Sequence, residues 1–119
     1  MNNWYGWIIE QSLDDQSFFD MVSTLKMKSE EEDWKEHIVE VPDEKLNEVA
    51  EFLKQHLLEK WYAHLVKGDQ MIVLYKNKEF RVEEGDDYTP MREYGLSHGV
   101  PEKQLPNQGL FDQAREEGL

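Results

Sequence analysis

Cysteine is absent from this chain of 119 residues, which excludes disulfides, thiolate zinc sites, iron–sulfur ligation and a cysteine nucleophile. No apolar run approaches the length of a membrane span, and the first residues lack the basic-then-apolar pattern of a secretion signal. A chain without cysteine fits a reducing compartment. We therefore expect a soluble, cytoplasmic protein that binds no membrane.

Basic residues are scarce. Lys and Arg number 13 against 26 Asp and Glu, so the formal net charge is −13. This sign disfavours direct binding to nucleic-acid phosphates, which bind basic surfaces. Residues 1–60 hold 15 acidic and 6 basic side chains (−9), whereas residues 61–119 hold 11 and 7 (−4). The acidic first half either keeps the chain soluble or imitates nucleic acid towards a basic partner protein.

Catalytic and cofactor motifs are missing as well. The serines stand in no nucleophile-elbow context, and there is no glycine-rich phosphate loop. The histidines are His37, His56, His64 and His98, and no two of them have the i, i+4 or i, i+2 spacing of a local metal site. We therefore expect no metal, no cofactor and no identifiable catalytic residue.

The strongest pattern in the chain lies in residues 61–82, where three short apolar runs are separated by two turns. This predicts an antiparallel meander. Gly68 in the first turn suits the positive φ of a two-residue hairpin loop, and Asn77 in the second tolerates it. Two-residue loops predict these cross-strand pairs: Val66 with Met71, Leu65 with Ile72, His64 with Val73, Tyr62 with Tyr75, Tyr75 with Phe80 and Val73 with Val82.

Both faces of this meander are apolar. Because side chains alternate along a strand, one face carries an aromatic-rich set: Tyr62, His64, Val66, Met71, Val73, Tyr75, Phe80 and Val82. The opposite face carries Trp61, Ala63, Leu65, Ile72 and Leu74. A sheet with one face in water shows a polar alternation instead. We expect helices to cover one face, and the chain's own tail, a second subunit or a ligand to cover the other.

The remaining elements complete an α+β fold with a largely antiparallel sheet and two or three helices mainly on one face. A ferredoxin-like arrangement is the alternative, if the first hairpin is a single strand. Hydrophobic spacing and capping residues predict these elements: a strand over 4–9, a helix from Ser12 or Asp14 to about 24, strands over 26–29 and 34–41, a helix over 44–58 with Asp43 as N-cap, and a helix from Thr89 to about 98.

Residues 1–105 are expected to form a single α+β domain, and residues 106–119 a polar, loosely ordered C-terminal tail. Leu110, Phe111 and Ala114 offer the tail an alternative, which is to dock as a last helical turn.

Two groups of residues are candidates for function. The acidic run Glu30, Glu31, Glu32 and Asp33 with Trp34 is either a solvated loop tip or a contact for a basic partner. The second group comprises His64, Tyr62 and Tyr75. A polar ring on an apolar face needs a partner, so His64 is either a core histidine bonded to a backbone carbonyl or part of a pocket.

Three stretches are notable together: residues 5–10 with Ser12-Leu13, residues 61–63 followed by 75–80, and residues 92–96 with Gly99-Val100-Pro101 and Gln104-Leu105. In these stretches the chain resembles a family of small uncharacterised prokaryotic proteins over most of residues 4–105. The resemblance implies a self-standing domain of prokaryotic or viral origin. It implies no activity, substrate or catalytic residue.

These observations favour a non-catalytic interaction or regulatory protein, which binds another protein through the aromatic-rich sheet face or the acidic surface. The acidic version includes a nucleic-acid mimic. The alternative is a small-molecule-binding domain, or an enzyme, with a pocket near His64 and Tyr62. A homodimer, in which a second copy covers the second sheet face, stays open.

Overall fold

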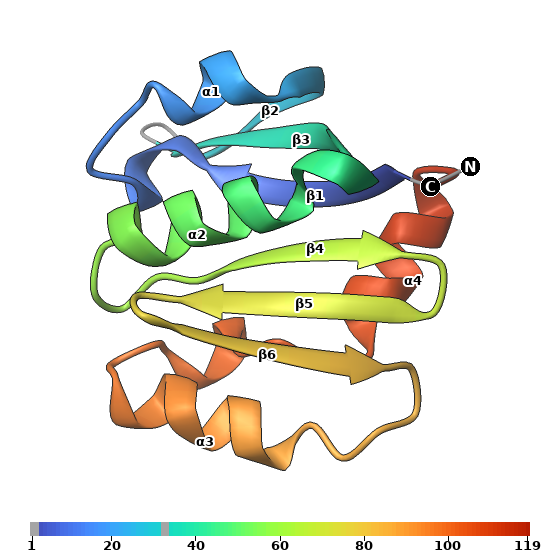
Figure 1. Ribbon diagram of the computed structural model, residues 1–119. Helices are drawn as coiled ribbons and strands as arrows, with labels where there is room; N and C mark the ends of the chain where they lie inside the picture. The colour runs from blue at the N-terminus through green and yellow to red at the C-terminus, as the bar shows by residue number, and fades with distance from the viewer. Residues whose placement is uncertain (1–2, 32–33) are drawn as a thin grey trace.

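Six strands form one antiparallel sheet in the computed structural model, which describes residues 3–31 and 34–119. Their order is β2-β3-β1-β4-β5-β6, so the N-terminal strand lies inside the sheet (Figure 1). The strands are β1 (Asn3–Ile9), β2 (Ser23–Glu31), β3 (Trp34–Pro42), β4 (Ala63–Lys67), β5 (Gln70–Tyr75) and β6 (Lys78–Glu83). The predicted α+β class with a largely antiparallel sheet is confirmed. The first hairpin consists of two strands, β2 and β3, and not of a single strand, which excludes the ferredoxin-like alternative.

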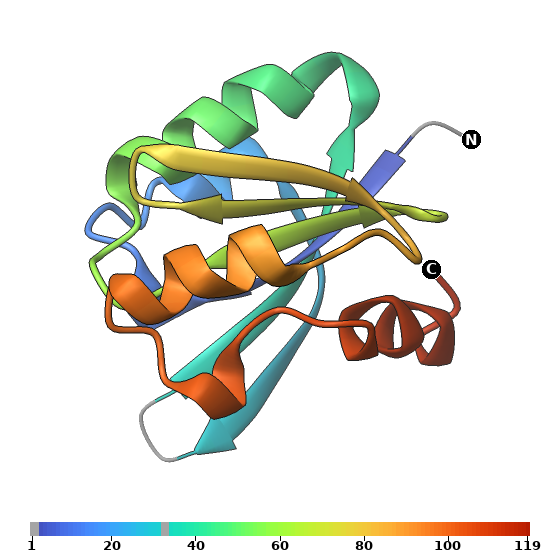
Figure 2. The same cartoon turned by 90° about the horizontal axis from the view of Figure 1, so that it is seen from below.

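The helices in the described residues are α1 (Phe18–Met21), α2 (Leu46–His56), α3 (Thr89–Ser97) and α4 (Gly109–Glu116). Short 3₁₀ turns lie at Glu10–Ser12, Asp43–Lys45 and Glu102–Gln104. Figure 2 shows α2 on one side of the sheet and both α3 and α4 on the other. The helices are thus shared between the two faces, whereas we expected them mainly on one.

The meander has the predicted strands and, at its first turn, the predicted register. Gly68 has a φ of +62°, and Leu65 pairs with Ile72. At the second turn the register differs by two residues, because the loop is Lys76-Asn77 and Tyr75 pairs with Lys78. Asn77 has a φ of +63°, and its N–H donates to the Lys54 carbonyl of α2 (2.9 Å). A shift of two residues keeps each side chain on its predicted face.

The first core lies between α2 and the sheet. Its helix residues are the predicted stripe Leu46, Val49, Ala50, Leu53 and Leu57, and all five are buried. Asp43 does not cap the helix as predicted, because the chain forms a 3₁₀ turn before α2 and no side-chain cap bond is present. Its Oδ1 instead accepts a hydrogen bond from Trp4 Nε1 (2.9 Å), which fixes the start of α2 against β1.

The helix predicted from Ser12 or Asp14 to about residue 24 is much shorter, since only Phe18–Met21 is α-helical. Two contacts explain the difference. The N–H of Asp14 donates to the His56 carbonyl (2.9 Å), which holds this segment against the end of α2. From Ser23 onward the chain is extended because it pairs with β3. Local helical spacing is overridden here by strand pairing.

The second core is covered by the chain's own C-terminal segment. Met91 of α3, Val100, Leu105 and Phe111 of α4 are buried against the aromatic-rich face. Gly95 lets α3 approach closely, because a Cβ there would lie 2.8 Å from Tyr75 Oη. We expected the chain's own tail, a second subunit or a ligand to cover this face, and in the structure the tail covers it. Residues 106–119, expected as a loosely ordered tail, contain the docked helix α4.

The helix α3 ends as its sequence indicates. Gly99 has a φ of +86°, the N–H of Val100 donates to the Gly95 carbonyl (3.0 Å) and that of Gly99 to the Leu96 carbonyl (3.2 Å). These are the two bonds of a Schellman motif. The motif turns the chain back under the sheet, towards the 3₁₀ turn at Glu102–Gln104.

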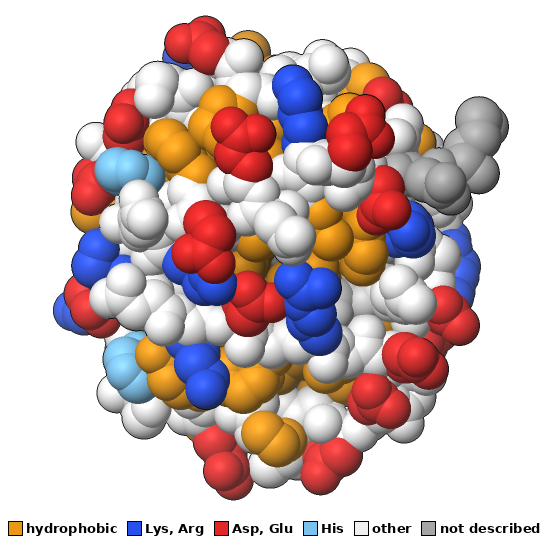
Figure 3. Space-filling view, in the orientation of Figure 1, with side chains coloured by type: hydrophobic (Ala, Val, Ile, Leu, Met, Phe, Trp, Pro, Cys, Tyr) orange, Lys and Arg blue, Asp and Glu red, His pale blue; other side chains and the backbone are white. Residues whose placement is uncertain are grey.

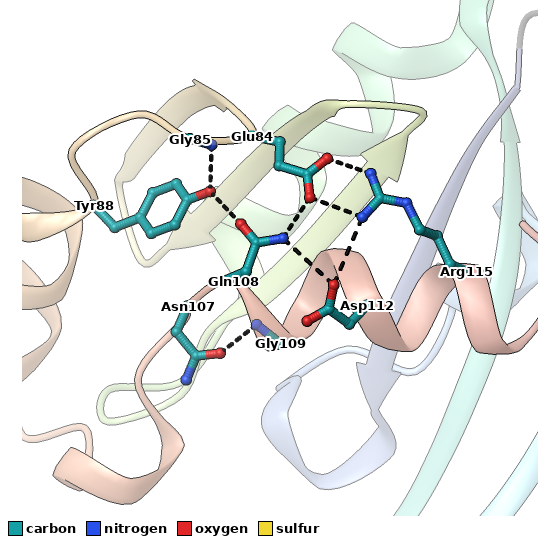
Figure 4. Close-up of polar contacts among 8 residues, drawn as sticks. All are labelled: Glu84, Gly85, Tyr88, Asn107, Gln108, Gly109, Asp112 and Arg115. Carbon is teal, nitrogen blue, oxygen red and sulfur yellow. Dashed lines mark hydrogen bonds and ion pairs between the residues drawn. The ribbon is translucent and has the colours of Figure 1, made fainter.

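Polar contacts join the segment that contains α4 to both edges of the sheet. At the β6 end, the carboxylate of Glu84 accepts hydrogen bonds from Arg115 and Gln108, and Tyr88 Oη donates to Gln108 Oε1 (3.1 Å) (Figure 4). At the other edge, Lys28 Nζ of β2 donates to Glu117 Oε1 (2.7 Å). The C-terminal segment therefore crosses the whole second face.

The bond from Arg115 is the main reason that the pKa of Glu84 is lowered, to about 2. A carboxyl group whose folded pKa is depressed stabilises the fold above its ordinary pKa and loses this contribution as the pH falls through the folded value. The ion pair of Glu84 with Arg115 in Figure 4 thus keeps its charges until the pH approaches 2.

We expect apolar burial, rather than these exposed ion pairs, to hold α4 in place. Phe111 is 1% exposed, so Phe111→Ala should lower the free energy of unfolding by about 3–5 kcal/mol. Arg115→Gln should have a small effect that disappears at high salt, because water and salt screen an exposed pair. Urea unfolding of both variants at low and high salt measures this. An Arg115→Gln variant as unstable as Phe111→Ala would contradict the expectation.

Candidate ligand-binding pocket

A pocket of about 410 Å³ lies between the second sheet face and the C-terminal segment. The sheet supplies residues from the end of β1, the start of β3 and the start of β4, and the C-terminal segment supplies residues 103–113. At the pocket, the side chains of the C-terminal segment do not pack directly on the strands. The pocket is thus a product of the way the tail crosses the sheet.

Trp7 and His64 form the floor of the pocket. They face each other across β1 and β4, and their rings stack with centroids 5.2 Å apart and planes 7° from parallel. Direct cross-strand partners lie on the same face of a sheet, which is why these two rings meet. Trp7 is 4% and His64 5% exposed.

Both rings carry a buried nitrogen without a hydrogen-bond partner among the described residues, Trp7 Nε1 and His64 Nε2. Buried polar atoms are nearly always paired in folded proteins. Leaving one unpaired costs about 1–3 kcal/mol. The two atoms belong to adjacent rings that both line the pocket, and both atoms are closed off from solvent, so a bound group supplies the missing bonds only if neighbouring side chains shift.

Burial lowers the pKa of His64 to about 4. The imidazole is therefore neutral near neutral pH, and one ring nitrogen carries a proton while the other accepts. Among the described residues, no carboxylate contributes to this lowering of the pKa. The floor of the pocket is aromatic, uncharged and polar only at its ring nitrogens.

The walls add further aromatic rings. Trp34 at the start of β3 and Trp61 before β4 meet edge to face, with ring centroids 5.1 Å apart. Tyr62 donates its hydroxyl hydrogen to the Gln104 carbonyl and so ties the sheet to the 3₁₀ turn. Burial raises the pKa of Tyr62 to about 12, and the negative charge of Glu36 adds to this.

Polar side chains are few inside the pocket and more frequent at its mouth. Glu36 pairs with Ile9 across β3 and β1 and is half-buried, as is Gln113 of α4. Lys60 and Lys103 are exposed at the rim. Positive charge therefore lies only where water screens it.

The structure separates the three predicted pocket residues. Tyr62 and His64 line the pocket, whereas Tyr75 does not. The hydroxyl of Tyr75 donates to the Met91 carbonyl of α3 (2.8 Å), and burial raises its pKa. Tyr75 thus joins α3 to the sheet.

The acidic run is divided in the same way. Trp34 lines the pocket, and the backbone of Glu30 and Glu31 belongs to β2. Glu32 and Asp33 lie outside the described residues.

Trp7 and Trp61 were not among the predicted site residues, although both line the pocket with Trp34. Alternation along the meander placed Trp61 on the face of Ala63 and Leu65. Trp61 packs against the core on that face, as predicted, and it also lines the pocket, since it precedes the strand, which begins at Ala63. The available signal was composition: a chain of this size has four tryptophans.

In residues 3–31 and 34–119, no helix is long and apolar enough to cross a membrane. Within the same residues, no three His, Asp or Glu side chains are grouped as a metal site requires. No family model, curated protein or solved structure matches this chain. Its function is therefore argued from the pocket.

The burial of His64 predicts a pH dependence of stability. The folded pKa of about 4 lies below the ordinary value of 6.5, so the unfolded chain binds the proton more readily. The contribution of neutral His64 to the free energy of unfolding is complete above pH 6.5, falls as the pH drops and is lost at about pH 4. Between about pH 7 and pH 5 we expect a loss of about 2 kcal/mol.

Urea unfolding at these two pH values measures the loss. His64→Phe keeps a ring on Trp7 and should remove most of this pH dependence. The control His98→Asn changes an exposed histidine at the end of α3 and should retain it. If His64→Phe keeps the pH dependence of the original chain, another group titrates in this range.

Proposed function

We propose that this protein binds a small molecule in the pocket beside His64 and Tyr62. The observation that carries the proposal is the pair of unpartnered nitrogens, Trp7 Nε1 and His64 Nε2, on rings that line the pocket. A volume of about 410 Å³ is within the range of ligand pockets. Because both nitrogens are buried, we expect neighbouring side chains to shift when a ligand bonds to them.

The residues of this pocket suit a binding protein better than they suit an enzyme. A general base is most effective when its pKa lies near the working pH, and that of His64 is about 4. The Tyr62 hydroxyl is engaged by the Gln104 carbonyl. The buried Ser12 hydroxyl donates to the Ile9 carbonyl (2.6 Å), so it is not placed as a nucleophile.

Two observations favour the pocket over a contact with another protein. The aromatic-rich sheet face, which we expected to meet a partner, is buried under α3 and α4. On the face that carries α2, basic side chains are interspersed with acidic ones (Figure 3). Lys54, for example, forms ion pairs with Glu51 and Glu79. Acidic residues on that face do not gather into one patch of the kind that a nucleic-acid mimic needs.

The indole N–H signals of the four tryptophans test the proposal directly. Trp7, Trp34 and Trp61 line the pocket, whereas Trp4 Nε1 is bonded to Asp43 in the other core. In a nuclear magnetic resonance screen with a library of small fragments, we expect binders that shift the three pocket indoles and leave Trp4 unmoved. Single Trp→Phe variants assign the four signals.

A variant that fills the pocket provides the control. Leu110→Trp places a large ring in the pocket lining, while Leu96→Trp places the same ring at an exposed position of α3. Fragment binding should be lost in the first variant and kept in the second. The proposal fails if no fragment shifts the pocket indoles, or if Leu110→Trp binds as well as Leu96→Trp.

A further inference from the structure

We infer that the ligand of this pocket is an uncharged planar heterocycle with hydrogen-bonding edges, the chemistry of a nucleobase. This inference rests on the proposed function and names its ligand class. The observation behind it is the joint placement of aromatic rings and hydrogen-bonding side chains around one pocket.

The rings provide flat surfaces in two orientations. Trp7 and His64 form a stacked pair on the floor, with planes 7° apart, while Trp34 and Trp61 meet at 65° to form a corner in the wall. A flat ring that enters the pocket is able to lie on one indole face and touch the edge of another. Stacking of this kind contributes about 1–3 kcal/mol for each base on an aromatic side chain.

The polar groups match the edge of a heterocycle. Trp7 Nε1 only donates, and the carboxylate of Glu36, when ionised, only accepts. The neutral His64 offers a donor or an acceptor at Nε2, according to its tautomer. A nucleobase edge presents donors and acceptors side by side, so it is able to bond to donors and acceptors of this kind without any charge.

The same contacts disfavour other ligand classes. A monosaccharide carries hydroxyl groups around its whole ring edge, whereas the polar side chains that are half-buried or buried in this lining are His64, Glu36 and Gln113. An anion would find no buried positive charge, since Lys60 and Lys103 are exposed at the rim and the chain carries −13. A quaternary ammonium ion would suit the indoles, but it has no acceptor atom for Trp7 Nε1, which only donates.

Tryptophan fluorescence and the indole N–H signals, measured on the full chain, distinguish these classes. The probes are adenosine, guanosine, uridine, adenosine monophosphate, glucose and tetramethylammonium. We expect at least one nucleoside to quench the fluorescence saturably and to shift Trp7, Trp34 and Trp61 but not Trp4. Glucose and tetramethylammonium should do neither.

Substitution of the stacking rings gives a quantitative check. Trp34→Ala or Trp61→Ala should weaken nucleoside binding about 5- to 150-fold, the factor that corresponds to one lost stack. The matched control Trp4→Phe, in the other core, should leave the affinity unchanged. Urea unfolding of each variant establishes that it is folded, and Trp34→Phe, which keeps a ring, should retain most of the binding.

The outcomes separate this inference from the proposed function. If library fragments shift the pocket indoles but no nucleoside does, the ligand class is wrong and small-molecule binding stands. If glucose or tetramethylammonium binds more tightly than every nucleoside, the ligand class is also wrong. Adenosine monophosphate binding more than tenfold tighter than adenosine would overturn the uncharged character of the ligand. If nothing shifts these indoles, both proposals fail.

Discussion

Apolar side chains on both faces of the central strands are the constraint on which the rest of this structure depends. In β4 and β5, successive residues are buried whichever face they point to, and apolar surface contributes about 25 cal/mol for each Å² removed from water. A single layer of helices would leave one face exposed. The fold therefore needs two covering layers, and it takes them from different parts of the chain: α2 precedes the meander and α3 with α4 follow it.

The second layer consists of α3, the 3₁₀ turn at Glu102–Gln104 and α4. It is joined to β5 by Tyr75, at the β6 end by the Glu84 contacts and at the β2 edge by Glu117. Between these attachments the 3₁₀ turn and α4 pass over the ends of β1 and β3 at a distance that side chains do not fill. The pocket is the space left there. The lining is aromatic because large rings fill part of the space between the C-terminal segment and the sheet.

The chemistry of the pocket follows from burial. A histidine whose pKa is held near 4 is uncharged at neutral pH, and a tyrosine with a pKa near 12 keeps its proton. Neither group is poised for proton transfer near neutral pH. Neutral rings with unsatisfied nitrogens suit recognition of a flat, polar and uncharged molecule better than they suit catalysis.

The sequence by itself determined the local elements and the faces of the meander. Gly68, Gly99 and the stripe of α2 have clear local signals, because turn geometry and helical spacing act over a few residues. The two-residue shift of strand register at Asn77 was not predicted. The predicted faces are still correct, because a shift of two residues preserves the alternation of side chains. The helix predicted from Ser12 or Asp14 to about 24 is α-helical only over Phe18–Met21, because the pairing of Ser23 onward with β3 is not local.

Only the tertiary structure decided what covers the second face and which residues form the pocket. Trp7, Trp34 and Trp61 are far apart in the chain, and they meet because β1 lies between β3 and β4. Strand order of this kind depends on the burial of all the strands together. No local pattern encodes it, and for that reason His64 was recognisable as a candidate from the sequence while its aromatic neighbours were not.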